Sequence, residues 1–119
     1  MQTKEFAEQT GLSAATLRYY EQEGLLRPER NANGYREYSA RDLEWVCFIL
    51  RLKDMDVPLA QIKEYARLRH LGDETVPERY QILQKHQAVL ERKRQELDAH
   101  WAFLERKLAW YRKKIGGQE

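Results

Sequence analysis

One arginine and two tyrosines follow a run of small residues in the stretch GLSAATLRYYEQEGLL. A guanidinium donates charge-assisted hydrogen bonds to a phosphate or pairs with guanine, and a tyrosine hydroxyl bonds a phosphate while its ring packs on sugar. Small residues at a helix start let the backbone approach the floor of a major groove, and the helix N-terminus favours a phosphate. The residues predicted to contact nucleic acid here are Ser13, Ala14, Ala15, Thr16, Arg18 and Tyr19. For Tyr20, packing beneath the following hairpin and contact with DNA both remain open.

A second set of candidate contact residues surrounds the dipeptide Asn33-Gly34. Asn-Gly is typical of a type I′ hairpin turn, because both central positions of that turn need positive φ. The segment LLRPERNANGYREY therefore predicts strand, turn and strand, a wing beside the helices. Arg36 follows the turn and is placed to reach into or beside a minor groove, where narrow tracts attract guanidinium. The set is Asn33, Gly34, Tyr35, Arg36 and Tyr38, of which one of the two tyrosines must face inward.

Four helices are expected around these residues. The first runs from Thr3 to about Thr10, and a second begins after the cap Ser13 and ends before Gly24, which outlines a helix-turn-helix. A third starts at Ser39 with a carboxylate at the third position and ends near Asp54. A fourth begins at Pro58 and ends before Gly72. On the third helix the predicted apolar stripe is Leu43, Val46, Cys47 and Leu50.

A long C-terminal helix is predicted over residues 77–114, which is about 57 Å at 1.5 Å per residue. Its heptad-like stripe predicts an antiparallel coiled coil between two chains, although one amphipathic helix folded onto the core is the alternative. The polar residues Gln87 and Arg94 interrupt the stripe, as residues that fix register do. The predicted dimerisation residues are Leu83, Leu90, Leu97, Trp101, Leu104, Leu108 and Tyr111. His86 and His100 are interpreted as solvated residues beside the stripe.

A family signature can be read in the N-terminal half of the chain. The residues that carry it are Thr16-Leu17-Arg18-Tyr19-Tyr20-Glu21, Gly24-Leu25-Leu26, Pro28, Arg30, Gly34-Tyr35-Arg36, Tyr38 and Asp42-Leu43. Over residues 3–68 the chain closely resembles the MerR family of transcription regulators. The resemblance implies a mainly α fold, with a winged helix-turn-helix over residues 1–72 followed by a linker and dimerisation helix over 73–119. It also implies phosphate contacts for Arg18 and Tyr19 and a DNA-facing Tyr38.

The same resemblance implies a mechanism and a signal. Family members activate promoters whose spacer is too long, by bending and untwisting the duplex so that RNA polymerase recognises both elements. Residues 72–111 are similar to a small subgroup associated with aldehyde, electrophile and nitrosative stress, several of whose members sense through one thiol on the third helix. Cys47 is the candidate sensor, but the usual thiol position aligns with Arg51. The apolar stripe favours a buried, inert Cys47 instead.

Composition limits the remaining function classes. Lys and Arg total 21 against 19 Asp and Glu, so the positions of the arginines, rather than net charge, argue for nucleic acid. No apolar run is long enough to cross a bilayer, no secretion signal is visible, and the single cysteine fits the cytoplasm.

We therefore expect a homodimeric regulator that binds double-stranded promoter DNA. It should not be an enzyme, and no cofactor, metal or membrane partner is expected; the small effector is unknown. The alternatives are an architectural, excisionase-like DNA binder without an effector and a coiled-coil interaction adaptor.

Overall fold

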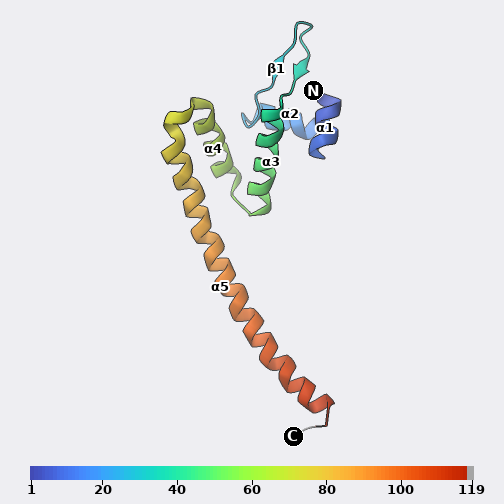
Figure 1. Ribbon diagram of the computed structural model, residues 1–119, viewed down its shortest axis with the longest axis vertical. Coiled ribbons are helices and arrows are strands. Elements are labelled where there is room, and N and C mark those ends of the chain that lie inside the picture. The colour runs from blue at the N-terminus through green and yellow to red at the C-terminus, as the bar shows by residue number, and fades with distance from the viewer. Residues whose placement is uncertain (118–119) are drawn as a thin grey trace. The chain divides into compact units, whose positions relative to one another are not determined.

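The computed structural model describes residues 1–117 and is mainly helical, as predicted (Figure 1). Its elements in chain order are α1 (Thr3–Thr10), α2 (Ala14–Gln22), β1 (Glu29–Arg30), β2 (Arg36–Glu37), α3 (Ala40–Asp54), α4 (Leu59–Leu71), the 3-10 helix η1 (Asp73–Thr75) and α5 (Val76–Ile115). The chain forms two compact units, of which the first is Met1–Ile82 and the second begins at Leu83. The domain boundary at residue 72 stays a prediction.

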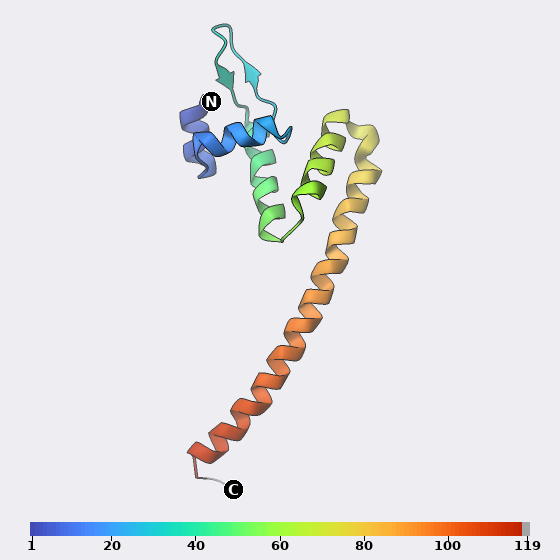
Figure 2. The ribbon, with the colours of Figure 1, turned by 180° about the vertical axis from the view of Figure 1, so that it is seen from behind.

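The core of the first unit gathers the inner faces of α1 to α4. Both ribbon views show α1 and α2 beside the N-terminal half of α3 (Figures 1 and 2). The indole Nε1 of Trp45 on α3 donates to the carbonyl of Leu25, just after α2, at 2.6 Å. The buried apolar residues are Phe6, Leu17, Tyr20, Leu25, Leu26, Tyr38, Trp45, Val46, Ile49, Leu52, Val57, Ile62, Ala66 and Leu68.

The helix-turn-helix is built from α1 and α2. Gly11 ends α1 with φ 76°, a left-handed conformation that glycine adopts without the steric cost of a Cβ. Ser13 then caps α2, because its Oγ accepts a hydrogen bond from the amide of Thr16 at 3.0 Å. Both predicted helices are confirmed.

The wing is a short antiparallel hairpin in which Glu29 pairs with Glu37 and Arg30 with Arg36. The predicted type I′ turn is wrong. Gly34 has φ 82°, but Asn33 is not among the described residues with positive φ. The amide of Gly34 bonds the Asn31 carbonyl and that of Asn31 bonds the Tyr35 carbonyl, which is a type I turn followed by one left-handed residue.

Helix α3 begins at a capping box and buries a different face from the one predicted. The Ser39 Oγ accepts from the Asp42 amide at 3.1 Å, and the Asp42 carboxylate accepts from the Ser39 amide at 2.9 Å. The buried residues are Trp45, Val46, Ile49 and Leu52, whereas Cys47 is exposed. The expectation of a buried Cys47 is therefore wrong, since the larger side chains of the Trp45, Ile49 and Leu52 series take the core face.

Helix α4 is held to the start of α5 by Thr75. The Thr75 hydroxyl lies 2.6 Å from the carbonyl of Leu68 and 2.7 Å from that of Gly72, so its single proton is shared between the last turn of α4 and the following loop. The hydroxyl also accepts a hydrogen bond from the Nε of Arg79 at 3.0 Å. These bonds fix the loop between α4 and α5.

Helix α5 is 40 residues long, close to the predicted range. In the second unit, most of its predicted dimerisation residues are exposed: Leu97, Trp101, Leu104, Leu108 and Tyr111, whereas Leu83 and Leu90 are half-buried. His86 is buried, contrary to the expectation that both histidines are solvated. No helix within residues 1–117 combines the length and the apolar character needed to span a bilayer.

Tyr38 belongs to the core of the first unit. Its ring is 3% exposed and stacks on that of Phe6, with the ring centres 4.1 Å apart and an angle of 7° between the planes. The Tyr38 amide also donates to the carbonyl of Met1 at 2.6 Å. The assignment of Tyr38 to the DNA side is therefore wrong, because the inward-facing tyrosine of the hairpin is Tyr38 and Tyr35 is the exposed one.

We expect Tyr38→Ala to lower the free energy of unfolding by about 3 to 5 kcal/mol, because it leaves a cavity beside Phe6. Tyr35→Ala is the matched control, since that ring is 64% exposed, and should change stability by less than about 0.5 kcal/mol. Urea unfolding followed by circular dichroism measures both. Equal losses of stability in the two variants would contradict the core position of Tyr38.

Candidate nucleic-acid interface

Helix α2 divides its residues between two faces. Leu17 and Tyr20 are buried, whereas Ala15 and Arg18 are exposed and Tyr19 is 44% exposed. Residues 15, 18 and 19 share one face of a helix because they are three and four positions apart. The structure therefore brings the predicted contacts Ala15, Arg18 and Tyr19 together on one outward surface.

The N-terminus of α2 adds polar groups to this surface. The hydroxyls of Ser13 and Thr16 lie 2.9 Å apart, and Ser13 satisfies the Thr16 amide. The first amides of an α-helix have no partner within the helix, so those at Ala14 and Ala15 are placed to bind an anion. The predicted small residues at the start of α2 thus leave its first turn open to an approaching phosphate.

The two adjacent tyrosines have different environments. The Tyr20 ring is 2% exposed, and its hydroxyl accepts a hydrogen bond from the Lys53 ammonium on α3 at 3.3 Å, which favours the packing interpretation for Tyr20. Tyr19 lies near Glu23, whose carboxylate accepts from the Lys63 ammonium on α4 at 3.0 Å. The Lys63 hydrogen bond, with a smaller contribution from the Tyr19 hydroxyl, lowers the pKa of Glu23.

The hairpin tip depends on two residues that are not among the predicted contacts. The Asn31 Oδ1 accepts from the amides of Asn33 and Tyr35 at 2.9 and 3.1 Å, and the Arg30 guanidinium donates to the Gly34 carbonyl at 2.9 Å. Asparagine bonding an amide two residues ahead is a common turn device, so Asn31 is the sequence signal that indicates this tip. Asn33, Gly34 and Tyr35 are all exposed there.

The Arg36 side chain donates hydrogen bonds to Glu21 on α2 and does not project away from the hairpin into solvent. Its Nε lies 3.0 Å from both carboxylate oxygens of Glu21, and its Nη2 donates to Glu21 Oε2 at 2.8 Å. This bidentate hydrogen bonding lowers the pKa of Glu21 against the opposing effect of burial, and it raises that of Arg36. The expectation that the Arg36 side chain reaches toward a minor groove is not met. Instead, Arg36 fixes the wing against α2.

Charge and metal chemistry complete the description of the interface. Arg18 on α2 and the exposed side chains of Asn33 and Tyr35 at the hairpin tip can donate hydrogen bonds to an oxyanion. In the described part of the chain, no group of three or more His, Cys, Asp or Glu side chains is placed to hold a metal ion. The arrangement can bind and orient a polyanion through α2 and the wing.

Comparisons with known proteins agree with this geometry. Residues 1–68 match the MerR HTH family regulatory protein profile, and residues 43–109 match the MerR DNA-binding profile. An HTH-type transcriptional regulator of Haemophilus influenzae is 36% identical over 112 residues, which cover 93% of this chain and 83% of the relative.

Two solved structures extend the likeness to the whole fold. HiNmlR, described as a MerR family regulator lacking the sensor domain and bound to promoter DNA, is 34% identical with a TM-score of 0.78, covering 98% of this chain and 94% of that one. A MerR family transcriptional regulator from Listeria monocytogenes is 28% identical with a TM-score of 0.85, covering 97% and 88%.

The helix-turn-helix, the wing and the outward face of α2 define a winged helix-turn-helix DNA-binding protein. The profile matches and relatives make the assignment more specific: the chain belongs to the MerR family of DNA-binding transcriptional regulators. Its relatives are named as transcriptional regulators, which are not enzymes, and this confirms the expectation on that point.

The Glu21–Arg36 ion pair makes stability dependent on pH. The folded state lowers the pKa of Glu21 below its ordinary value of 4.5, so the pair stabilises the protein above that pH and its contribution is lost as the pH falls below it. Glu21→Gln should cost about 1 kcal/mol at pH 7, because the pair is still partly solvated. The difference from wild type should shrink below pH 4.5 in urea titrations. Glu8→Gln on α1 is the control. A difference in the free energy of unfolding between wild type and Glu21→Gln that does not change with pH would contradict the role of the pair.

Proposed function

We propose that the protein is a homodimer that binds double-stranded promoter DNA through two copies of the α2 surface and the hairpin tip. The observation that carries the proposal is the outward face of α2, where an open helix N-terminus, Arg18 and Tyr19 lie together. The proposed DNA-contacting residues are Ser13, Ala14, Ala15, Thr16, Arg18, Tyr19, Asn33, Gly34 and Tyr35. Arg36 is proposed as a positioning residue, because it contacts Glu21.

The exposed apolar stripe of α5 supports the dimer. Trp101 is 70% exposed, Leu97 65% and Leu104 56%, and they repeat at the three- and four-residue steps of a coiled-coil seam. Contiguous apolar patches of this kind on a soluble protein mark interaction sites. A second copy of the same helix, running antiparallel, covers this stripe in the proposal.

Dimerisation also supports DNA binding. One chain with a formal net charge of +2 has little electrostatic attraction for DNA. When two α2 surfaces are linked in a dimer, binding of the first to a two-fold symmetric site holds the second near its half-site. The second contact then forms at a high effective concentration, so the dimer binds more tightly than one surface alone. We infer that the dimer, rather than the single chain, is the form that recognises a promoter.

Promoter distortion is the proposed mode of activation. Bending or untwisting a duplex costs several kcal/mol, so the protein must hold the deformed DNA on a stiff frame. The ties from α2 to its neighbours, through Glu21–Arg36 and Glu23–Lys63, supply such a frame. Realigning the two promoter elements lets RNA polymerase bind, which makes the polymerase a proposed partner.

We further infer a stress-responsive role in the cytoplasm, where promoter DNA and polymerase are found in bacteria. The exposed Cys47 thiol supports the candidate sensor role, because a thiol must be accessible to react with an electrophile. The chain and HiNmlR share nearly full-length similarity, and HiNmlR is described as lacking a sensor domain.

Arg18→Ala should weaken binding to promoter DNA and reduce the salt dependence of that binding. Each protomer of the variant makes one phosphate contact fewer, which lowers the slope of log K against log salt by about two for the dimer. The measurement is fluorescence anisotropy over a salt series, with a promoter fragment recovered by mapping bound sites across the genome. Arg106→Ala on α5 is the control and should leave the slope unchanged. An unchanged slope in Arg18→Ala would remove this residue from the interface.

Leu104→Glu should convert the dimer to a monomer, because it places a carboxylate in the apolar seam. Leu104 is already 56% exposed in the single chain, so the folded first unit should keep its circular dichroism spectrum. Light scattering after size exclusion gives the mass. Ala102→Glu introduces the same side chain beside the stripe and should stay dimeric. A wild-type monomer at concentrations that still bind promoter DNA would refute the proposed dimer.

A further inference from the structure

One cavity in the first unit is rich in arginine and is lined by none of the proposed DNA-contacting residues. Its volume is about 480 Å³, and it is enclosed by the loop before β1, the start of α3, the end of α4, η1 and the first turn of α5. Four arginines line it: Arg27, Arg41, Arg69 and Arg79. A cavity of this size is within the range that holds small ligands in proteins.

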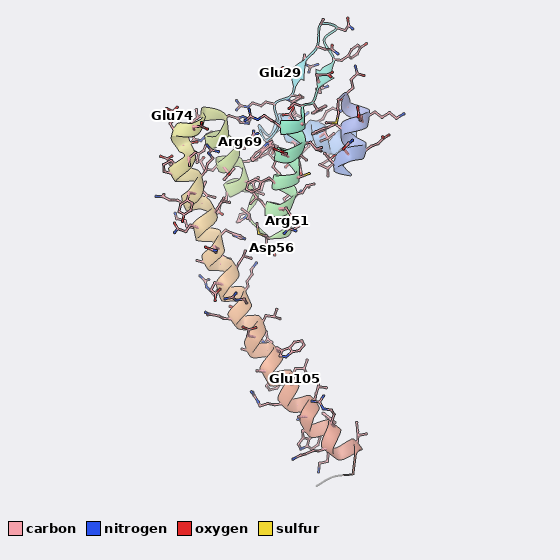
Figure 3. All side chains as sticks on the ribbon, viewed as in Figure 1. Glu29, Arg51, Asp56, Arg69, Glu74 and Glu105 are labelled. Carbon is pink, nitrogen blue, oxygen red and sulfur yellow. The ribbon has the colours of Figure 1, made fainter. Side chains whose placement is uncertain are left out.

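The guanidinium groups in this cavity are not neutralised by ion pairs in the way that Arg36 and Arg67 are. Arg27 and Arg41 form no ion pair within residues 1–117. Arg69 extends from α4 toward α3, and its guanidinium lies 4.3 Å from the centre of the Trp45 ring (Figure 3). Burial, and then the nearby charge of Arg41, lowers the pKa of Arg69. Arg69 is therefore partly desolvated beside a second positive charge, whereas Arg27 and Arg41 are exposed.

Arg79 is already oriented by its neighbours. Its Nε donates to the Thr75 hydroxyl at 3.0 Å, and its Nη2 donates to the Gly72 carbonyl at 3.2 Å. A guanidinium has five N–H donors, so these two bonds leave others for a ligand. The loop that Thr75 fixes between α4 and α5 thus presents a pre-positioned donor to the cavity.

Three carboxylates also line the cavity, and they do not cancel its positive charge. Asp42 accepts the Ser39 amide as part of the capping box, while Glu29 and Asp73 are exposed. The cavity is lined by four guanidinium groups and three carboxylates, so its lining carries an excess of one positive charge. Fixed guanidinium donors of this kind select oxyanions over other anions.

His70 also lines the cavity. Its Nε2 is buried and has no hydrogen-bond partner. Burial, followed by the charges of Arg27 and Arg69, lowers the pKa of His70, and a hydrogen bond to the backbone of Gly24 opposes that shift. The positive charges that act on His70 are the ones that an oxyanion in the cavity would meet.

We propose that this cavity binds a small phosphate ester, with the phosphate group on Arg27, Arg41, Arg69 and Arg79. Phosphate oxygens accept hydrogen bonds from several guanidiniums at once, which a monocarboxylate cannot do to the same extent. The inference goes beyond DNA binding, because it adds a site for a small effector on residues that the DNA proposal does not use.

The test uses the full chain with inorganic phosphate and phenyl phosphate as probes and acetate as the monovalent comparison, measured by isothermal titration calorimetry. Both phosphates should bind more tightly than acetate, because each can accept hydrogen bonds from several guanidiniums at once. Arg69→Gln should weaken phenyl phosphate binding about tenfold or more. Arg67→Gln is the matched control, because Arg67 lies on the same helix but is paired with Glu64, and it should change the affinity less than about twofold.

Arg41→Gln provides a second variant at an exposed position, so a folding defect in Arg69→Gln would not prevent the test. Promoter DNA binding is measured on the same proteins in phosphate-free buffer, and both variants should keep the wild-type affinity. Equal phosphate binding by wild type, Arg69→Gln and Arg41→Gln would overturn the proposal. A parallel loss of DNA and phosphate binding would also overturn it, because the arginines would then bind the DNA backbone. If the wild-type protein does not bind promoter DNA but does bind phosphate, the result contradicts the proposed function and supports the phosphate site.

Discussion

The facial division of α2 is the constraint on which the reading surface depends. Leu17 and Tyr20 must enter the core, and the helical period then forces Arg18 and Tyr19 outward. The Trp45 bond to the Leu25 carbonyl fixes where the chain leaves α2, so the helix cannot rotate without losing a buried hydrogen bond. The orientation of the outward side chains of α2 is thus set by what is buried behind them.

Polar ties reinforce this orientation from three sides. Glu21 bonds Arg36 on the wing, Glu23 bonds Lys63 on α4, and Tyr20 accepts from Lys53 on α3. Each tie is partly solvated and individually modest in energy, but together they link α2 to every neighbouring element except α1. Acidic residues of α2, which repel phosphate when unpaired, are neutralised by these bonds. The same ion pairs that hold α2 in place therefore also reduce the repulsion between its carboxylates and a phosphate.

The element order, the cap at Ser13 and the length of α5 could be predicted because local sequence determines them. Periodicity and caps are properties of a few consecutive residues. The buried face of α3 was mispredicted because two apolar series overlap there, and only packing against the neighbouring helices selects Trp45 and Ile49 over Cys47. Tyr38 and Arg36 were misassigned for the same reason, since Phe6 and Glu21, which decide their positions, are distant in sequence. The arginine cavity likewise unites residues from five separate segments.

The net charge of the chain does not describe the local environments of its arginines. An excess of two positive charges suggests a weak attraction for any polyanion. The arginines nevertheless fall into three environments: Arg36 and Arg67 are neutralised by carboxylates, Arg18 is solvated on α2, and Arg69 with its neighbours is confined in a cavity. Confinement raises the electrostatic cost of the last group, because like charges repel more strongly away from water. In the proposal, a phosphate bound in the cavity offsets this repulsion.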